Sequence, residues 1–138
     1  MKKLIFSFAL FILLTSSGLW LARQNALKKR QASISPLVYE TSTRYGLRPS
    51  FVFALIKKES NFQINARGKF QEYGLMQIRE GVADDWCREH KRDNFRSYGI
   101  LMDPKMNIEI GTWYLAKGIK RWKGYKHQEQ IALAQYNA

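Results

Sequence analysis

Residues 4–22, near the start of the chain, form an uncharged run of nineteen residues. Only the sequence after this run is available to form a globular domain. At the rise of an α-helix such a run spans about 28 Å, close to the roughly 30 Å of bilayer hydrocarbon. Lys2 and Lys3 precede it, as positive residues precede anchors and signal peptides. We expect an N-terminal hydrophobic helix that stays attached as an anchor. Small residues at 15–18 keep a cleaved signal peptide as the alternative.

The sequence after this run divides into two further parts. Residues 23–34 are polar and basic, which suits a short juxtamembrane stalk. The whole chain is 46% hydrophobic and 25% charged, an ordinary globular mixture, and its 138 residues leave room for one compact domain. We therefore predict a targeting segment at residues 1–22, a stalk at 23–34 and a single domain at 35–138.

The net charge of +12 is divided between the targeting end and the domain. Residues 1–30 hold six bases and no acid, so the rest of the chain carries 17 bases and 11 acids, a net +6. A positive domain favours an anionic partner, which could be cell-wall polymer, phospholipid head groups or nucleic acid. We expect no nucleic-acid binding, because the bases of residues 36–138 look dispersed along the sequence.

Helical periodicity dominates residues 35–138. Ser35 and Pro36 are typical of an N-cap followed by a first-turn proline, which predicts a helix from there to about Gly46. We expect further helices at residues 49–59, from about 75 to 86, from about 103 to 122, and from about 127 onward. No alternating strand pattern persists, so the predicted class is a small all-α domain preceded by the hydrophobic helix.

Several kinds of chemistry find no support in the sequence. Cys87 is the single cysteine, so there is no disulfide framework, and it is expected to be a buried thiol. No group of His and Cys residues has metal-ligand spacing, and no glycine-rich loop resembles a phosphate-binding turn. We therefore expect neither a metal nor an organic cofactor.

The position of Glu59 is the most informative feature for function. On a helix, Glu59 shares one stripe with Val52, Leu55 and Ile56, so it points toward the side that packs. Burial raises the pKa of a carboxyl group, and a raised pKa suits a general acid that works near neutral pH. The alternative is that Glu59 reaches solvent or pairs with Arg44 or Arg48.

Four sequence blocks decide between these alternatives. They are Glu59-Ser60-Asn61-Phe62, Gly74-Leu75-Met76-Gln77-Ile78, the stretch from Asp103-Pro104 through Asn107-Ile108 and Gly111 to Tyr114-Leu115, and Ala132-Leu133-Ala134-Gln135-Tyr136-Asn137-Ala138. In this order they resemble the catalytic domain of the soluble lytic transglycosylases, a small lysozyme-like helical fold. The resemblance covers about residues 36–138.

The resemblance implies a role for individual residues. Glu59 would be the catalytic acid, and Ser60 beside it would orient the substrate. Gly74 would let the backbone approach the sugar, while Met76 and Gln77 would line the cleft. The substrate-binding set is completed by Tyr136, which would contact Glu59 or the sugar, and by Asn137, which would shape the cleft. Asn107 is expected to bond backbone locally.

The same resemblance implies cleavage of peptidoglycan without water. Glu59 would protonate the glycosidic oxygen and then take the proton from the C6 hydroxyl of the same muramyl sugar, which closes a 1,6-anhydro ring. The alternative within the enzymes is a lysozyme-like hydrolase, with Glu72 as the second carboxylate that hydrolases commonly use. Asp84, Asp85, Glu89 and Asp93 lie in a charged stretch that indicates a solvated face.

Family relatives usually continue beyond the Tyr-Asn-Ala block, whereas this sequence stops at Ala138. We expect a loosened site there, and a catalytically weak, membrane-anchored wall-binding protein is the alternative outside the enzymes. The expected location is extracytoplasmic, either anchored in the inner membrane or secreted. Expected partners are peptidoglycan strands, the membrane through the N-terminal segment, and a secretion or conjugation apparatus.

Overall fold

The computed structural model describes the backbone of residues 2–92 and 98–137, and the side chains of residues 17–92 and 99–137. The chain forms two compact units, Met1–Ser33 and Ile34–Ala138. The described residues form six helices and only isolated β-bridges, which confirms the predicted all-α class. They are α1 (Lys2–Arg44), α2 (Pro49–Ser60), α3 (Glu80–Glu89), α4 (Tyr98–Met102), α5 (Pro104–Arg121) and α6 (Gln128–Tyr136).

The first unit consists of the N-terminal part of α1. Among the residues whose side chains are described, no helix is long and apolar enough to cross a bilayer. Most of the predicted anchor, residues 4–16, lies outside those residues. The boundaries predicted at residues 22 and 34 stay predictions.

The predicted helix start at Ser35 and Pro36 is wrong, because α1 runs through both residues. Proline has no N–H to donate, so Pro36 removes the hydrogen bond that the Ala32 carbonyl would accept inside a helix. The helix nevertheless continues on both sides of this single missing bond. Ile34 before Pro36 and Val38 after it are both buried and belong to the core of the second unit.

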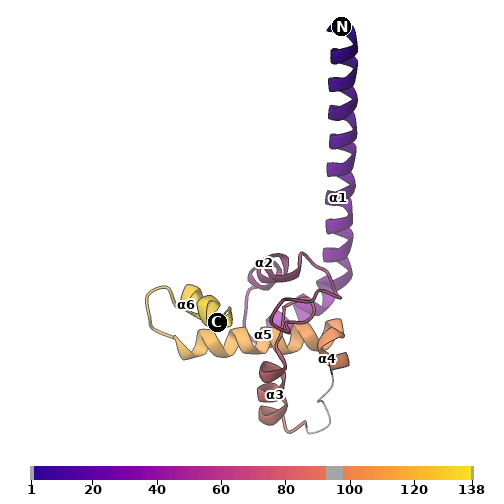
Figure 1. Cartoon of the computed structure of the whole chain (residues 1–138). Coiled ribbons are helices and arrows are strands. Elements are labelled where there is room, and N and C mark those ends of the chain that lie inside the picture. The colour runs from indigo at the N-terminus through magenta and orange to yellow at the C-terminus, as the bar shows by residue number, and fades with distance from the viewer. Residues whose placement is uncertain (1, 93–97, 138) are drawn as a thin grey trace. The chain divides into compact units, whose positions relative to one another are not determined.

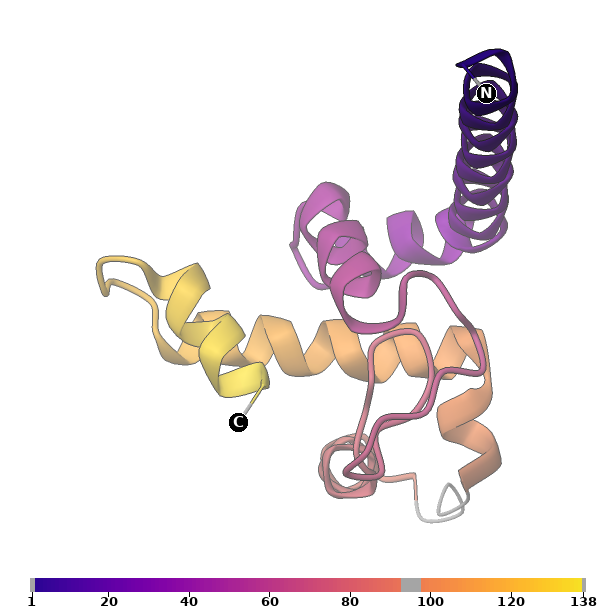
Figure 2. The same cartoon turned by 45° about the horizontal axis from the view of Figure 1, so that its top comes forward.

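The second unit is organised around α5. Figures 1 and 2 show α6 lying along the C-terminal part of α5, with α3 and α4 toward its other end, and α5 contacts all three helices. Asp103 caps α5 by accepting a hydrogen bond from the Met106 backbone N–H at 2.9 Å, as predicted from the Asp-Pro pair. Ile108 and Leu115 are buried along the helix. Gly118 leaves room for Ala132 where α6 packs on α5.

Helix α2 supplies the stripe predicted from the sequence. Pro49 occupies its first turn, and the helix ends at Asn61, which has a left-handed φ of 52°. Val52, Leu55 and Ile56 are buried, so the apolar face of α2 packs into the domain. Glu59 follows on this face in the last turn of the helix.

The helix predicted from about residue 75 begins only at Glu80. The segment before it is a tight turn in which the backbones of Tyr73 and Ile78 exchange two hydrogen bonds of 3.0 Å. Gly74 and Gln77 have φ values of 75° and 49°, which lie in the left-handed region. These two conformations break the helical path, so the apolar residues of the turn are buried without belonging to a helix.

Candidate active site

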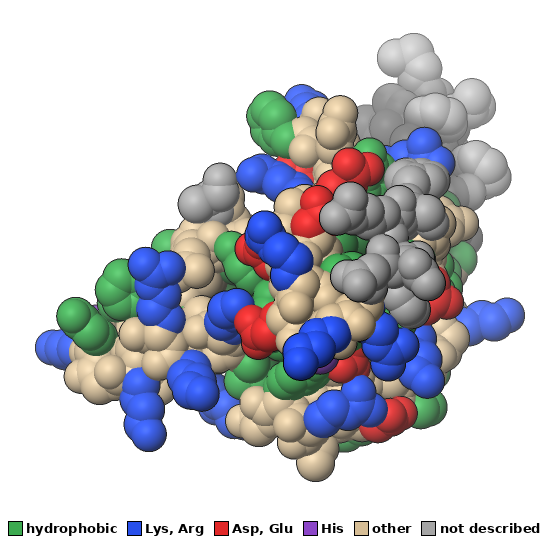
Figure 3. All heavy atoms as spheres, turned by 90° about the horizontal axis from the view of Figure 1, so that it is seen from below, with side chains coloured by type: hydrophobic (Ala, Val, Ile, Leu, Met, Phe, Trp, Pro, Cys, Tyr) green, Lys and Arg blue, Asp and Glu red, His purple; other side chains and the backbone are tan. Residues whose placement is uncertain are grey.

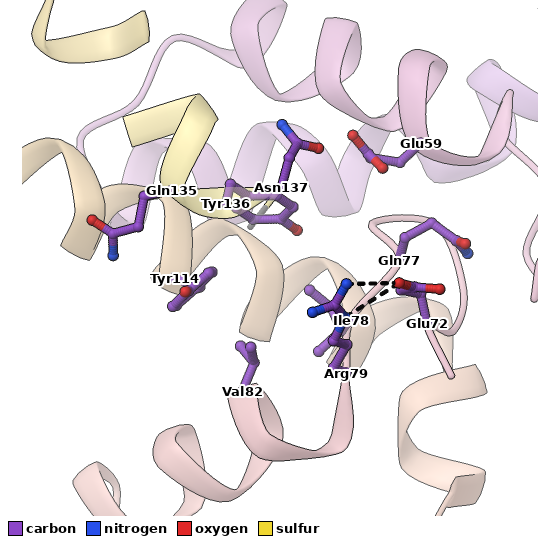
Figure 4. A pocket seen from close by; sticks show the side chains of 10 residues that line it. All are labelled: Glu59, Glu72, Gln77, Ile78, Arg79, Val82, Tyr114, Gln135, Tyr136 and Asn137. Atoms are coloured by element: carbon purple, nitrogen blue, oxygen red, sulfur yellow. Dashed lines mark hydrogen bonds and ion pairs between the residues drawn. The ribbon is translucent and has the colours of Figure 1, made fainter. Parts of the chain in front are cut away.

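A pocket of about 290 Å³ lies in the second unit, at the end of the buried stripe of α2. Its walls come from α2, the turn before α3, α3 itself, α5 and α6 (Figure 4). The lining residues are Glu59, Glu72, Gln77, Ile78, Arg79, Val82, Tyr114, Gln135, Tyr136 and Asn137.

Glu59 points from α2 into this pocket. Its side chain is only 15% exposed, and its Oε1 atom has no hydrogen-bond partner among the described residues. A cation lies nearby, since Lys58 Nζ is 3.9 Å from that oxygen. Pairing with Arg44 or Arg48 is excluded, because these arginines bind Glu109 and Glu129 respectively.

The surroundings of Glu59 favour its protonated form. Burial raises the pKa of the Glu59 carboxyl above its ordinary value, and the nearby negative charge of Glu72 raises it further. The ammonium group of Lys58 acts in the opposite direction without cancelling the effect. Glu59 therefore keeps a proton to higher pH than an exposed glutamate, which is what a general acid needs.

Glu72 is a second carboxylate in the pocket, with a different environment. Its burial alone would raise its pKa, but hydrogen bonds from the Phe70 backbone N–H and from Arg79 outweigh that effect and hold the pKa below the ordinary value. Arg79 Nη2 lies 3.0 Å from the Glu72 carboxylate, as the dashed lines in Figure 4 show. Glu59 and Glu72 thus form a pair of carboxyls whose pKa values are shifted in opposite directions.

Asn107 fastens the turn that forms one side of the pocket. Its Oδ1 accepts a hydrogen bond of 2.7 Å from the Met76 backbone N–H, and its Nδ2 donates to the carbonyls of Tyr73 and Leu101, both at 2.8 Å. The expectation that Asn107 bonds backbone only locally is therefore wrong. Its partners in the turn lie more than thirty positions earlier, so sequence spacing gave no sign of them.

Tyr136 connects α6 to the same turn. Its hydroxyl donates a hydrogen bond of 2.8 Å to the Met76 carbonyl, and its ring lies 5.5 Å from that of Tyr114. Burial raises the Tyr136 pKa well above its ordinary value, and the charges of Glu59 and Tyr114 raise it further. The hydroxyl therefore stays protonated and keeps its hydrogen bond to the Met76 carbonyl.

Four of the seven residues predicted for the site line the pocket, namely Glu59, Gln77, Tyr136 and Asn137. The other three lie behind it. The Ser60 hydroxyl donates to the Ile56 carbonyl of its own helix, and the Met76 side chain is fully buried against Gly111. Gly74 faces Asn107 and Leu101. These three residues shape the walls from inside the domain.

Four further lining residues, Ile78, Arg79, Val82 and Gln135, were not expected at the site. Ile78 and Val82 are four residues apart, which is the spacing of core positions in a helix, so the sequence indicated core residues there. No local sequence pattern marks the turn before α3 as part of a site. Arg79 could have been suspected from Glu72, because a carboxylate next to a site needs a partner when it is partly buried. Nothing in the sequence pointed to Gln135 beyond its place next to Tyr136.

Replacing Tyr136 by phenylalanine should destabilise the domain by about 1 kcal/mol, because the Met76 carbonyl loses a partly buried hydrogen bond while the ring is kept. Urea unfolding monitored by circular dichroism measures this change. The matched control is Tyr125→Phe, since the Tyr125 side chain is largely exposed and its loss of a hydroxyl should change little. Equal stability of the two variants would contradict an anchoring role for Tyr136.

The helical fold and the pocket around Glu59 agree with the family to which the sequence belongs. Residues 36–138 match the Transglycosylase SLT domain, and the chain belongs to that family. The match spans the same residues as the resemblance found in the sequence and confirms it.

Two curated relatives show the degree of similarity. Membrane-bound lytic murein transglycosylase C of Pectobacterium atrosepticum is 35% identical over 93 residues, which are 67% of this chain and 26% of that protein. The protein of the same name from Yersinia pestis is 34% identical over the same shares. The chain thus spans about a quarter of the length of these relatives.

Solved structures show the same fold. Lytic transglycosylase Slt of Pseudomonas aeruginosa, solved as an inactive mutant, superposes with a TM-score of 0.66 at 29% identity. The 70-kDa soluble lytic transglycosylase of Escherichia coli superposes with a TM-score of 0.66 at 27% identity. Each match covers 75% of this chain and 16% of the other, which confirms the lysozyme-like helical fold of the domain.

Proposed function

We propose that this chain is a peptidoglycan lytic transglycosylase that cleaves the bond between N-acetylmuramic acid and N-acetylglucosamine and leaves a 1,6-anhydromuramyl end. Membership of the SLT domain family and the names of the relatives support this activity. The observation that carries the proposal is Glu59, a carboxyl with a raised pKa and no hydrogen-bond partner for its Oε1 among the described residues. Because Glu59 lines the pocket, its carboxyl group is positioned to give a proton to a substrate oxygen bound there.

In the proposed reaction Glu59 acts twice. Its proton goes to the glycosidic oxygen, so that the bond to the leaving sugar breaks as positive charge develops on the muramyl ring. The resulting carboxylate then removes the proton of the C6 hydroxyl, whose oxygen closes the anhydro ring on C1. The proton returns to Glu59, so the enzyme is regenerated without water. An internal nucleophile has a high effective concentration, which replaces the second carboxylate of a hydrolase.

The residues around Glu59 would hold the sugar in place. Gln77 uses one amide N–H on the Gly74 carbonyl at 2.9 Å, which leaves its other groups for an N-acetyl group or a hydroxyl. The Tyr136 hydroxyl donates its hydrogen bond to the Met76 carbonyl and can still accept a hydrogen bond from a sugar hydroxyl. Asn137 reaches the same pocket from the end of α6 (Figure 4). Ser60, Gly74 and Met76 would support the cleft rather than contact the sugar.

Glu72 favours a second candidate function, a lysozyme-like hydrolase. An ionised carboxylate in the same pocket could activate water or stabilise positive charge on the sugar. Product analysis separates the two, because an anhydro end is one water lighter than a reducing end in mass spectrometry of digested sacculi.

We expect anhydro products from the full chain, and we expect Glu72→Gln to change the rate by less than about ten-fold without changing the products. The reason is that Glu72 is held by Arg79 and has no step to perform in the internal cyclisation. Two results together would establish the hydrolase instead. The wild-type chain would give products with reducing ends, and Glu72→Gln would lose the activity that forms them.

The proposed setting follows from the N-terminal part of the chain and from the relatives. We propose an extracytoplasmic location with residues 1–22 as a membrane segment and 23–34 as a stalk. The curated relatives named above are called membrane-bound, which agrees with this setting. A secretion or conjugation apparatus is the proposed partner that would need local opening of the wall.

A further inference from the structure

The positive charge of the domain is concentrated in one stretch of sequence. Residues 110–128 contain five bases and no acid, which gives +5 of the net +6 carried by residues 31–138. The expectation that the bases are dispersed is therefore wrong for this stretch. It covers most of α5, the loop that follows and the start of α6.

These bases lie in the last part of α5 and in the loop after it, which we call the basic end: Lys117, Lys120, Arg121, Lys123 and Lys126, with Tyr125 between the last two. All five bases are exposed. Figure 3 shows Lys and Arg side chains over the end of the molecule where α5 passes into α6.

The acids closest to the basic end in the sequence are already paired. Glu109 binds Arg44 at 2.7 Å, and Glu129 binds Arg48 at 3.0 Å. Glu89 reaches the surface from α3 and binds Lys117, whose ammonium group also lies over the Trp113 ring. The other three lysines form no ion pair with the acids of the described residues, so their charges are available to an outside anion.

Aromatic side chains and one hydrogen bond connect the basic end to the pocket. Tyr125 is 62% exposed and packs edge-on against Trp122 at 5.5 Å. The Trp122 indole N–H donates to Gln135 Oε1 at 2.9 Å, and Gln135 lines the pocket of Glu59. Tyr114, another lining residue, lies one turn before Lys117 on α5. The basic end therefore adjoins the residues of α5 and α6 that line the pocket.

We propose that the basic end is a second binding surface for peptidoglycan, which takes the free carboxylates of its peptide stems beside the glycan held in the pocket. This proposal rests on the proposed function. Peptidoglycan strands repeat their anionic stems along their length, and exposed lysines at successive turns of α5 and its loop match such a repeat in charge. Continuity with the pocket favours this partner over a phospholipid surface or nucleic acid.

The test compares two triple variants with the same change in net charge. One removes charge from the basic end, Lys120→Gln with Lys123→Gln and Lys126→Gln. The control removes it elsewhere, Lys57→Gln with Lys91→Gln and Lys105→Gln, all exposed lysines outside the pocket. Both are made in the full chain with Glu59→Gln, which is expected not to cleave, and binding to purified sacculi is measured by co-sedimentation in non-ionic detergent.

At low salt the basic-end triple should bind sacculi about ten-fold more weakly than the control triple, as expected from three exposed charge contacts of ordinary strength. The difference should shrink at high salt, because exposed charges are screened. It should also vanish on sacculi whose carboxylates have been converted to amides. Together these results would support a carboxylate-binding surface.

Equal binding by the two triples would overturn the proposal, since net charge alone would then explain the attraction. A difference that persists on amidated sacculi would exclude carboxylates as the ligand. A larger difference on phosphatidylglycerol mixed micelles or on duplex DNA would assign the surface to lipid or nucleic acid. None of these binding outcomes depends on cleavage. The proposed function is tested separately, by measuring whether the chain with Glu59 intact releases products from sacculi.

Discussion

Glu59→Gln should lower the release of glycan fragments from sacculi by at least about a thousand-fold. A positioned general acid or base typically contributes a hundred- to ten-thousand-fold, and Glu59 would serve as both in the proposed reaction. Glutamine keeps the size of the side chain but carries no transferable proton. The measurement is the rate of soluble muropeptide release, with products identified by mass.

The same substitution should stabilise the folded domain at neutral pH. Because the pKa of Glu59 is raised in the folded protein, protonation contributes stability that is fully present below the unfolded pKa and is lost as the pH rises through the folded pKa. Glutamine is neutral throughout, so it avoids the cost of a charged oxygen that has no hydrogen bond. Relieving such a buried, unsatisfied group is typically worth about 1 kcal/mol or more.

Urea unfolding at pH 7 and below pH 4 separates this effect from an unspecific one. The gain of Glu59→Gln over the wild-type chain should be present at pH 7 and shrink toward the acid range. Glu80→Gln is the matched control, since Glu80 is an exposed glutamate in the first turn of α3. It should keep activity and lose a few tenths of a kcal/mol at pH 7, because it removes a negative charge from a helix N-terminus. An active Glu59→Gln chain would refute the catalytic assignment, whatever its stability.

The parts of the domain that could be predicted are those governed by local rules. The proline at the start of α2 and the Asp-Pro pair before α5 are signals that act within one helical turn, and both helices begin there. The stripe that ends in Glu59 is also local, since residues three and four apart share one face of a helix. The orientation of Glu59 toward the packed side of α2 could therefore be predicted from the sequence alone.

The parts that were missed depend on contacts between distant residues. Pro36 interrupts helical hydrogen bonding locally, yet α1 continues through it. The turn at residues 73–78 looks helical by its apolar spacing, but Asn107 holds it through bonds to Met76 and Tyr73. No rule based on neighbouring residues predicts hydrogen bonds between such distant positions. The wall of the pocket opposite Glu59 was consequently the least predictable part of the site.

Gly74→Ala should be among the most destabilising single substitutions in the domain, with an expected loss of about 3 kcal/mol or more in the free energy of unfolding. An added Cβ would lie 2.5 Å from Asn107 Nδ2 and 2.7 Å from the Leu101 backbone carbonyl oxygen, and the backbone at this site has a φ of 75°. The left-handed conformation alone costs a residue with a Cβ about 1–2 kcal/mol. Moving Asn107 aside also sacrifices its buried hydrogen bonds, at about 1 kcal/mol each.

Gly46→Ala isolates the first of these two costs. Gly46 follows α1 with a φ of 67°, almost the same backbone conformation, but nothing lies within 4 Å of the position that an added Cβ would take. It should therefore lose only about 1–2 kcal/mol in urea unfolding.

The excess loss in Gly74→Ala measures the contact with Asn107 and Leu101. This excess should come with weakened glycan cleavage, because the turn also carries Gln77 and the Met76 carbonyl that anchors Tyr136. Equal losses of unfolding free energy in the two alanine variants would mean that the turn shifts at little cost to make room for the added Cβ. In that case Asn107 would not hold the pocket wall.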